Sequence, residues 1–213
     1  MPDEVLVVTG TGRAIVADAD IVGCHDVGQT VLDGLQRRSH QTFGPAAGQP
    51  RAKVCAASGY APCGGLELVM RCDLAFVSEG AKLGHVQIKL GLIPGGSGAR
   101  CLPRVPGSMR AIDILMTGQA MPAAEAVETG AALETGAHDA LMSRTMEFAE
   151  SLAEIAPVAL REARRVVENG FDAVLNVGLT RVHCVLDAVS GTEGGKEGII
   201  VFMEEGAPAF KGQ

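Results

Sequence analysis

The sequence contains no tryptophan and a single tyrosine among its 213 residues. Proteins that bind single-stranded nucleic acids stack the bases on aromatic side chains, and this chain offers no such set. Positive charge is also scarce, because 18 lysines and arginines stand against 25 acidic residues and the formal net charge is −7. The composition therefore argues against a nucleic-acid-binding protein.

Long apolar runs and a leader-like N-terminus are missing as well. Although 47% of the residues are hydrophobic, no run approaches the roughly 20 apolar residues that cross a bilayer. No basic segment followed by an apolar stretch opens the sequence. The six cysteines show no Cys-x-x-Cys spacing, so we predict no metal site and reduced, mostly buried thiols. We expect a cytoplasmic protein with no membrane partner.

Two glycine-rich turns organise the stretch 57–98. The first turn, 62–65, runs into apolar residues with helical spacing, which predicts a helix that begins near Gly64. The first N–H groups of a helix have no internal partner and favour negative charge. Such a helix start can hold an anion, or an oxygen that becomes one during a reaction. Glu67 follows in the first turn, next to this position.

The rest of the chain predicts a β-rich first half and an all-helical second half. Gly10 and Gly12 form a turn, because the third glycine of a dinucleotide-binding fingerprint would fall at Ile15. A run rich in β-branched residues predicts a buried strand at 4–9, and short, mostly apolar runs predict further buried strands at 53–58 and 73–78. Apolar spacing predicts helices at 26–39, 109–116, 122–129, 139–155, 157–169, 171–190 and 196–205. Alternating strands and helices indicate an α/β protein.

The central stretch resembles a known family. Gly-Tyr-Ala-x-x-Gly-Gly-x-Glu-Leu, then Cys-Asp, then Gly-x-x-x-Ile-Lys-Leu-Gly-Leu-Ile-Pro-Gly-Gly, is similar to the enoyl-CoA hydratase/isomerase family, the crotonase superfamily. The likeness extends from about Glu4 to the C-terminus. It implies a crotonase-like β-β-α coiled core over 1–135 and a helical C-terminal trimerisation region over 136–213. The family usually begins with one more strand and helix before the strand at 4–9, so the core is expected to be N-terminally short.

The resemblance also implies a ligand. The substrate would be an acyl-CoA or enoyl-CoA thioester, with coenzyme A as part of the substrate and no separate cofactor. The subunits would assemble as a homotrimer or a hexamer. The helices from residue 139 onward have wide apolar faces, which is consistent with burial between subunits.

Two backbone N–H groups would form the oxyanion hole of this family. The matching positions are Ala19 and Gly64, and Ala17, Asp20 and Ile21 would line the substrate site. The glycine that the family places before that alanine is Asp18 here. From local sequence alone, Gly64 is also explained as an ordinary glycine at a helix start.

Glu67 matches the first of two catalytic glutamates in the family's hydratases, although a glutamate in a first turn also complements the helix dipole. The second glutamate is replaced by Gln87, which can hold water but cannot deliver a proton to carbon. Gly95 matches the glycine that helps to hold the attacking water, and is alternatively a plain turn residue. His85 could serve as an acid, but a surface or hydrogen-bonded structural histidine is the stronger expectation. Cys63 has no base beside it in the sequence, so catalysis by its thiol is not expected.

These residues favour an enzyme that acts on an acyl-CoA thioester through an enolate stabilised by the oxyanion hole. The first interpretation is an enoyl-CoA hydratase with Glu67 as base. The alternative is a catalytically impaired crotonase homologue that binds acyl-CoA or serves as an assembly subunit. Gln87 and the short N-terminus favour the alternative, whereas Gly64, Glu67 and Gly95 favour the enzyme.

Overall fold

The structure is a computed structural model that describes residues 5–17, 37, 41, 49–95, 97–204, 206 and 210. Two compact units make up the chain. The core unit comprises Val7–Gln49 and Lys53–Met146, and the C-terminal unit comprises Met1–Leu6, Pro50–Ala52 and Glu147–Gln213. The helix expected at 26–39 lies outside the described residues, apart from residue 37. The predicted division after residue 135 stays a prediction.

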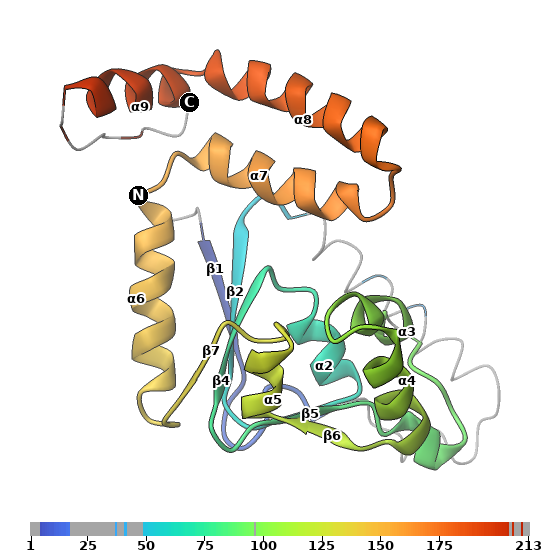
Figure 1. The fold of residues 1–213 in the computed structure, drawn as a ribbon. Coiled ribbons are helices and arrows are strands. Elements are labelled where there is room, and N and C mark those ends of the chain that lie inside the picture. Colours follow the sequence, from blue (N-terminus) through green and yellow to red (C-terminus); the bar gives the residue numbers. More distant parts are fainter. Residues whose placement is uncertain are drawn as a thin grey trace. The chain divides into compact units, whose positions relative to one another are not determined.

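A four-stranded sheet with the order β1-β2-β4-β7 is the larger of the two sheets (Figure 1). Its strands are β1 (Val5–Thr9), β2 (Ala52–Ala57), β4 (Leu74–Ser78) and β7 (Glu134–Gly136). β4 pairs in parallel with both β2 and β7. The strands expected at 4–9, 53–58 and 73–78 are therefore confirmed. β1 is not buried as predicted, because it is an edge strand, and Leu6 is 40% exposed.

A second sheet contains three short strands with the order β3-β5-β6. β3 (Tyr60–Pro62) runs parallel to β5 (Lys82–Gly84), and β5 runs antiparallel to β6 (Ala120–Pro122). None of these three strands was predicted, because three residues are too few to show an alternating pattern. β6 and β7 also make the expectation of an all-helical second half wrong.

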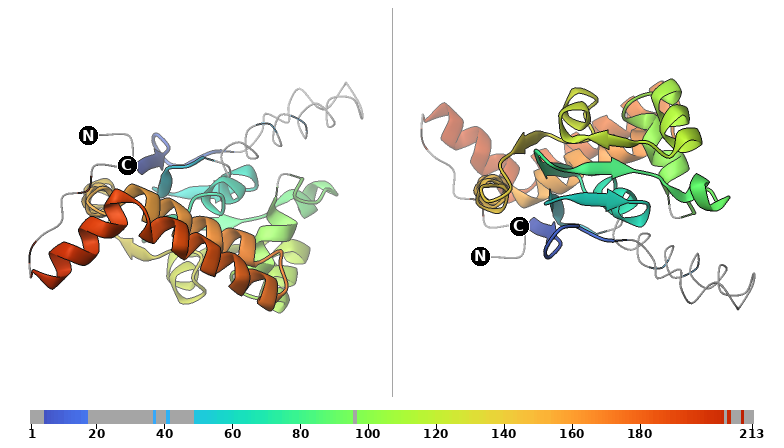
Figure 2. Two further views of the ribbon diagram at one scale, coloured as in Figure 1. Left: turned by 90° about the horizontal axis from the view of Figure 1, so that it is seen from above. Right: turned by 90° about the horizontal axis from the view of Figure 1, so that it is seen from below.

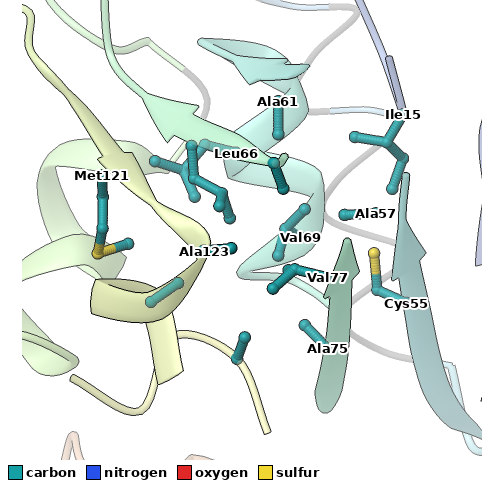
Figure 3. Close-up of a cluster of buried hydrophobic side chains, with 14 of the residues drawn as sticks. Ile15, Cys55, Ala57, Ala61, Leu66, Val69, Ala75, Val77, Met121 and Ala123 are labelled. Atoms are coloured by element: carbon teal, nitrogen blue, oxygen red, sulfur yellow. The ribbon is translucent and has the colours of Figure 1, made fainter. Parts of the chain in front are cut away.

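Short helices complete the core unit. They are α2 (Gly64–Val69), α3 (Gly98–Cys101), α4 (Ser108–Thr117) and α5 (Ala123–Glu128), with the 3₁₀ turns η2 (Gln87–Leu90) and η3 (Leu102–Arg104). α2 buries Leu66 and Val69 against β2 and β4, and Figure 3 shows these side chains in one cluster with Ala57 and Val77. The helix expected to begin near Gly64 is confirmed, as are those at 109–116 and 122–129, although Pro122 precedes α5 as its N-cap.

The remaining helices are α6 (Leu141–Ala153), α7 (Pro157–Gly170), α8 (Leu175–Ser190) and α9 (Glu193–Met203). Four helices were expected here and are confirmed, with α8 beginning four residues later than predicted because Val174 is extended. Within the C-terminal unit, α7 and α8 lie side by side (Figures 1 and 2). No helix among the described residues combines the length and the apolar character that crossing a bilayer needs. The fold as a whole is mixed α/β.

Candidate active site

A sharp turn from β3 into α2 positions Gly64 and Glu67. Cys63, the residue between the two elements, has φ 49° and ψ −110°, a combination that residues with a Cβ atom rarely adopt. Its N–H donates to the carbonyl oxygen of Gly84 at 2.7 Å. Backbone strain of this kind costs on the order of 1–3 kcal/mol and persists only where the surrounding structure fixes it. The pairing of β3 with β5 therefore fixes the point at which α2 begins.

Glu67 lies in the first turn of α2 and is only 4% exposed. Its Oε1 accepts two backbone hydrogen bonds, from the N–H groups of Ser97 and Gly98, each at 2.7 Å. Hydrogen bonds to an ionised carboxylate are roughly twice as strong as those between neutral groups. The loop before α3 therefore holds this buried carboxylate. These two donors were not predicted, because they are backbone groups in a glycine-rich segment, Gly-Gly-Ser-Gly at 95–98, that indicates only a turn.

The His85 ring lies directly against Gly98. A Cβ atom on Gly98 would be 2.4 Å from Cε1 and Nε2 of His85, which no side chain could tolerate without a shift of the ring or the loop. His85 is 1% exposed, so the prediction that it could be a surface histidine is wrong. Its ring packs inside the core unit. Because Gly98 is one of the two donors to Glu67, this packing also sets the position of the carboxylate.

Gln87 begins η2, two residues after His85. Its Oε1 is buried and has no hydrogen-bond partner among the described residues. Gly95 is exposed in the loop between η2 and α3. α3 and β5 both contact α2, so the segment that carries Gln87 and Gly95 begins and ends beside the helix that carries Glu67.

The segment before residue 18 is also attached to the start of α2. The Ile15 N–H donates to the Tyr60 carbonyl oxygen at 3.1 Å, and the Tyr60 N–H donates to that of Arg13 at 3.0 Å. A Cβ atom on Gly65 would lie 2.7 Å from the carbonyl oxygen of Val16, so this glycine allows close contact. Ala17, which follows Val16, is exposed. The predicted residues Ala19, Asp20 and Ile21 lie outside the described residues.

Comparison with known proteins identifies the family to which this arrangement belongs. The sequence profile described as Enoyl-CoA hydratase/isomerase matches residues 3–213. The chain belongs to the enoyl-CoA hydratase/isomerase family. A probable enoyl-CoA hydratase from Mycobacterium bovis is 33% identical over 205 residues, which are 96% of this chain and 79% of that protein.

Solved structures of the enoyl-CoA hydratase/isomerase family have the same fold. A protein described as enoyl-CoA hydratase subunit I from Geobacillus kaustophilus has a TM-score of 0.93 and 32% identity, covering 99% of this chain and 81% of its own. An enoyl-CoA hydratase from Bacillus anthracis has a TM-score of 0.94 and 30% identity, covering 99% of this chain and 82% of its own. The expected crotonase fold is confirmed.

The cysteines of this family member differ in burial and in their neighbours. Cys55 in β2 and Cys72, which follows α2, are neighbours at the end of α2 opposite Gly64. The hydrogen bond between the two thiols raises the pKa of Cys55, and burial is the second cause of this increase. The same hydrogen bond lowers the pKa of Cys72. Cys55 and Cys63 are buried but Cys184 is exposed, so the prediction of mostly buried thiols holds only in part. The described residues contain no cluster of His, Cys, Asp and Glu that could bind a metal ion.

Proposed function

We propose that this protein is an enoyl-CoA hydratase in which Glu67 transfers the proton. One observation carries the proposal: a glutamate that is almost fully buried, yet fixed by two N–H donors, lies in the first turn of the helix that begins at Gly64. A buried carboxylate is costly unless hydrogen bonds compensate for its lost hydration. Its retention in the core, within a family named for this chemistry, supports a catalytic role.

The proposed reaction adds water across the C2–C3 double bond of an enoyl-CoA thioester. Glu67 accepts a proton from water as the oxygen bonds to C3, and the electron pair of the double bond moves through C2 to the thioester oxygen. The N–H groups of Gly64 and Ala19 would stabilise that oxyanion, and the loss of one such donor typically costs about 3–4 kcal/mol. The enolate then takes a proton at C2, which restores the thioester carbonyl.

Gln87 changes which residue can supply the proton to C2. With glutamine at the position of the family's second glutamate, no second carboxyl group supplies the proton to C2. We propose that Glu67 returns to C2 the proton that it took from water, while Gln87 and Gly95 hold the water. Ala17, Asp20 and Ile21 would line the pocket for the acyl-CoA, and coenzyme A would be part of the substrate.

Crotonyl-CoA hydration tests the proposal directly. The enoyl absorbance should fall when the protein is added, and 3-hydroxybutyryl-CoA should appear in equal amount. If no hydration occurs while coenzyme A esters still raise the melting temperature, the protein is the catalytically impaired acyl-CoA binder of the alternative interpretation. If neither is seen, the hydratase and the acyl-CoA binder are both excluded, and only the assembly subunit of the alternative interpretation remains.

We also propose that the protein is a homotrimer, or a hexamer of paired trimers. The C-terminal unit exposes large apolar side chains, among them Phe171 (61%), Leu175 (79%) and Met203 (78%). Exposed apolar surface of this extent is typical of subunit interfaces. Sedimentation should give a species of three or six chains, and a stable monomer at micromolar concentration would contradict the proposal.

The described cysteines are free thiols, and we propose the cytoplasm, a reducing compartment, as the location.

A further inference from the structure

The hydroxyl group of Ser97 is not used in the way its position predicts. Ser97 is the N-cap residue of α3, where a serine hydroxyl usually accepts a backbone N–H of the first turn. Here the side chain makes no capping hydrogen bond, and only the backbone carbonyl oxygen of Ser97 accepts, from the N–H groups of Arg100 and Cys101 at 2.9 Å each. Ser97 Oγ is nevertheless buried, and it has no hydrogen-bond partner among the described residues.

A buried hydroxyl group without a hydrogen-bond partner destabilises the folded protein. Sites that keep such a group often satisfy it with a water molecule or a ligand. The hydroxyl group of Ser97 can therefore form a hydrogen bond with a water molecule or a ligand.

Covalent geometry places this hydroxyl close to Glu67. The Ser97 N–H donates to Glu67 Oε1 at 2.7 Å, and a serine Oγ is separated from its own amide nitrogen by only three bonds. The hydroxyl oxygen therefore lies within roughly 6 Å of the carboxylate. A single oxygen atom between the two groups can hydrogen-bond to both at that separation.

A second buried oxygen strengthens the case. Gln87 Oε1 also has no hydrogen-bond partner in the described part of the chain. Gln87 lies two residues after His85, and the His85 ring contacts Gly98, the residue next to Ser97. The amide oxygen only accepts hydrogen bonds, whereas the serine hydroxyl both donates and accepts. A water molecule or an alcohol offers the complementary donor and acceptor.

We propose that Ser97 is a further substrate-contacting residue, whose hydroxyl hydrogen-bonds the oxygen that is added to C3. This oxygen belongs to water in the hydration direction and is the 3-hydroxyl group in the reverse direction. The inference rests on the proposed function, because it assigns Ser97 to the same site. It adds a protein group on the water side, where Gln87 has replaced a carboxylate.

The test compares three thioesters that differ only at C2 and C3. 3-Hydroxybutyryl-CoA has the oxygen, whereas butyryl-CoA and crotonyl-CoA lack it. Wild-type protein should bind 3-hydroxybutyryl-CoA more tightly than butyryl-CoA by calorimetry. Ser97→Ala should reduce that preference about 5- to 20-fold and lower kcat for crotonyl-CoA by a similar factor, with little change in its KM. Ser97→Thr, which keeps a hydroxyl group, should retain most of the preference.

Ser143→Ala, at an exposed serine of α6, controls for a general effect of replacing serine by alanine and should leave both measurements unchanged. If Ser97→Ala keeps the wild-type preference for the 3-hydroxy ester while crotonyl-CoA is still hydrated, Ser97 has no such contact and only this inference fails. If wild-type protein neither hydrates crotonyl-CoA nor binds any of the three esters, the proposed function fails and the inference fails with it.

Discussion

Replacing Glu67 by glutamine separates the chemical role of the carboxylate from its structural role. The two side chains have nearly the same shape, and the glutamine Oε1 can still accept the N–H groups of Ser97 and Gly98. Each bond then changes from charge-assisted, worth about 1.5–3 kcal/mol, to neutral, worth about 0.5–1.5 kcal/mol. The neutral amide is cheaper to bury than a carboxylate, which offsets part of this loss.

A net loss of about 1–2 kcal/mol follows, and in a chain of this size it lowers the melting temperature by roughly 2–8 °C. The effect on catalysis should be much larger, because glutamine cannot take a proton from water. The loss of one acid–base group reduces turnover by about 10²- to 10⁴-fold. Hydration of crotonyl-CoA, followed by its absorbance, and thermal unfolding measure the two effects on the same samples.

Glu128→Gln is the matched control, because Glu128 is an exposed glutamate at the end of α5. It should leave both the rate and the melting temperature at wild-type values. Turnover that barely changes in Glu67→Gln, together with a lowered melting temperature, would show that Glu67 only anchors the loop before α3. That result would refute the proposal that Glu67 transfers the proton.

Three further predictions concern the residues around this carboxylate. Gln87→Glu should raise hydration of crotonyl-CoA by one to three orders of magnitude, about the contribution of one acid–base group, and an unchanged rate would place the limitation in substrate binding. Gly98→Ala should lower the hydration rate and also lower the free energy of unfolding by about 1–3 kcal/mol, because the added Cβ would clash with the His85 ring. Gly80→Ala is the control, since nothing lies within 4 Å of a Cβ there, and it should change neither quantity. Cys63→Gly should be more stable than Cys63→Ala by about 1 kcal/mol in denaturant unfolding, because φ is positive there; the usual order, with alanine more stable, would contradict the strain assigned to this turn.

The sequence predicted the longer elements well because their patterns are long enough to detect. The apolar runs at 53–58 and 73–78 are strands of the main sheet, and the helices after residue 139 follow their apolar spacing closely. β3, β5 and β6 were missed because each has three residues and their pairing depends on segments far apart in the chain. The exposure of β1 was missed because a sequence pattern does not reveal which strand lies at the edge of a sheet.

At the candidate site, the sequence indicated the helix start and Glu67 but not the groups that hold the carboxylate. The donors are backbone N–H groups, and every residue other than proline has one. Nothing in the identity of Ser97 distinguished its N–H from any other. Gly98 was recognisable only as one glycine of several, since the constraint on it comes from the His85 ring, which is brought there by the fold.

The two donors to Glu67 follow it in the chain by only 30 and 31 residues. The entropy lost in closing a loop rises slowly with its length, so the carboxylate meets its donors at a modest cost. At a synthesis rate of about 5–20 residues per second, a ribosome adds this segment within seconds. The nascent chain therefore contains the carboxylate and both of its donors well before the last three helices have been synthesised.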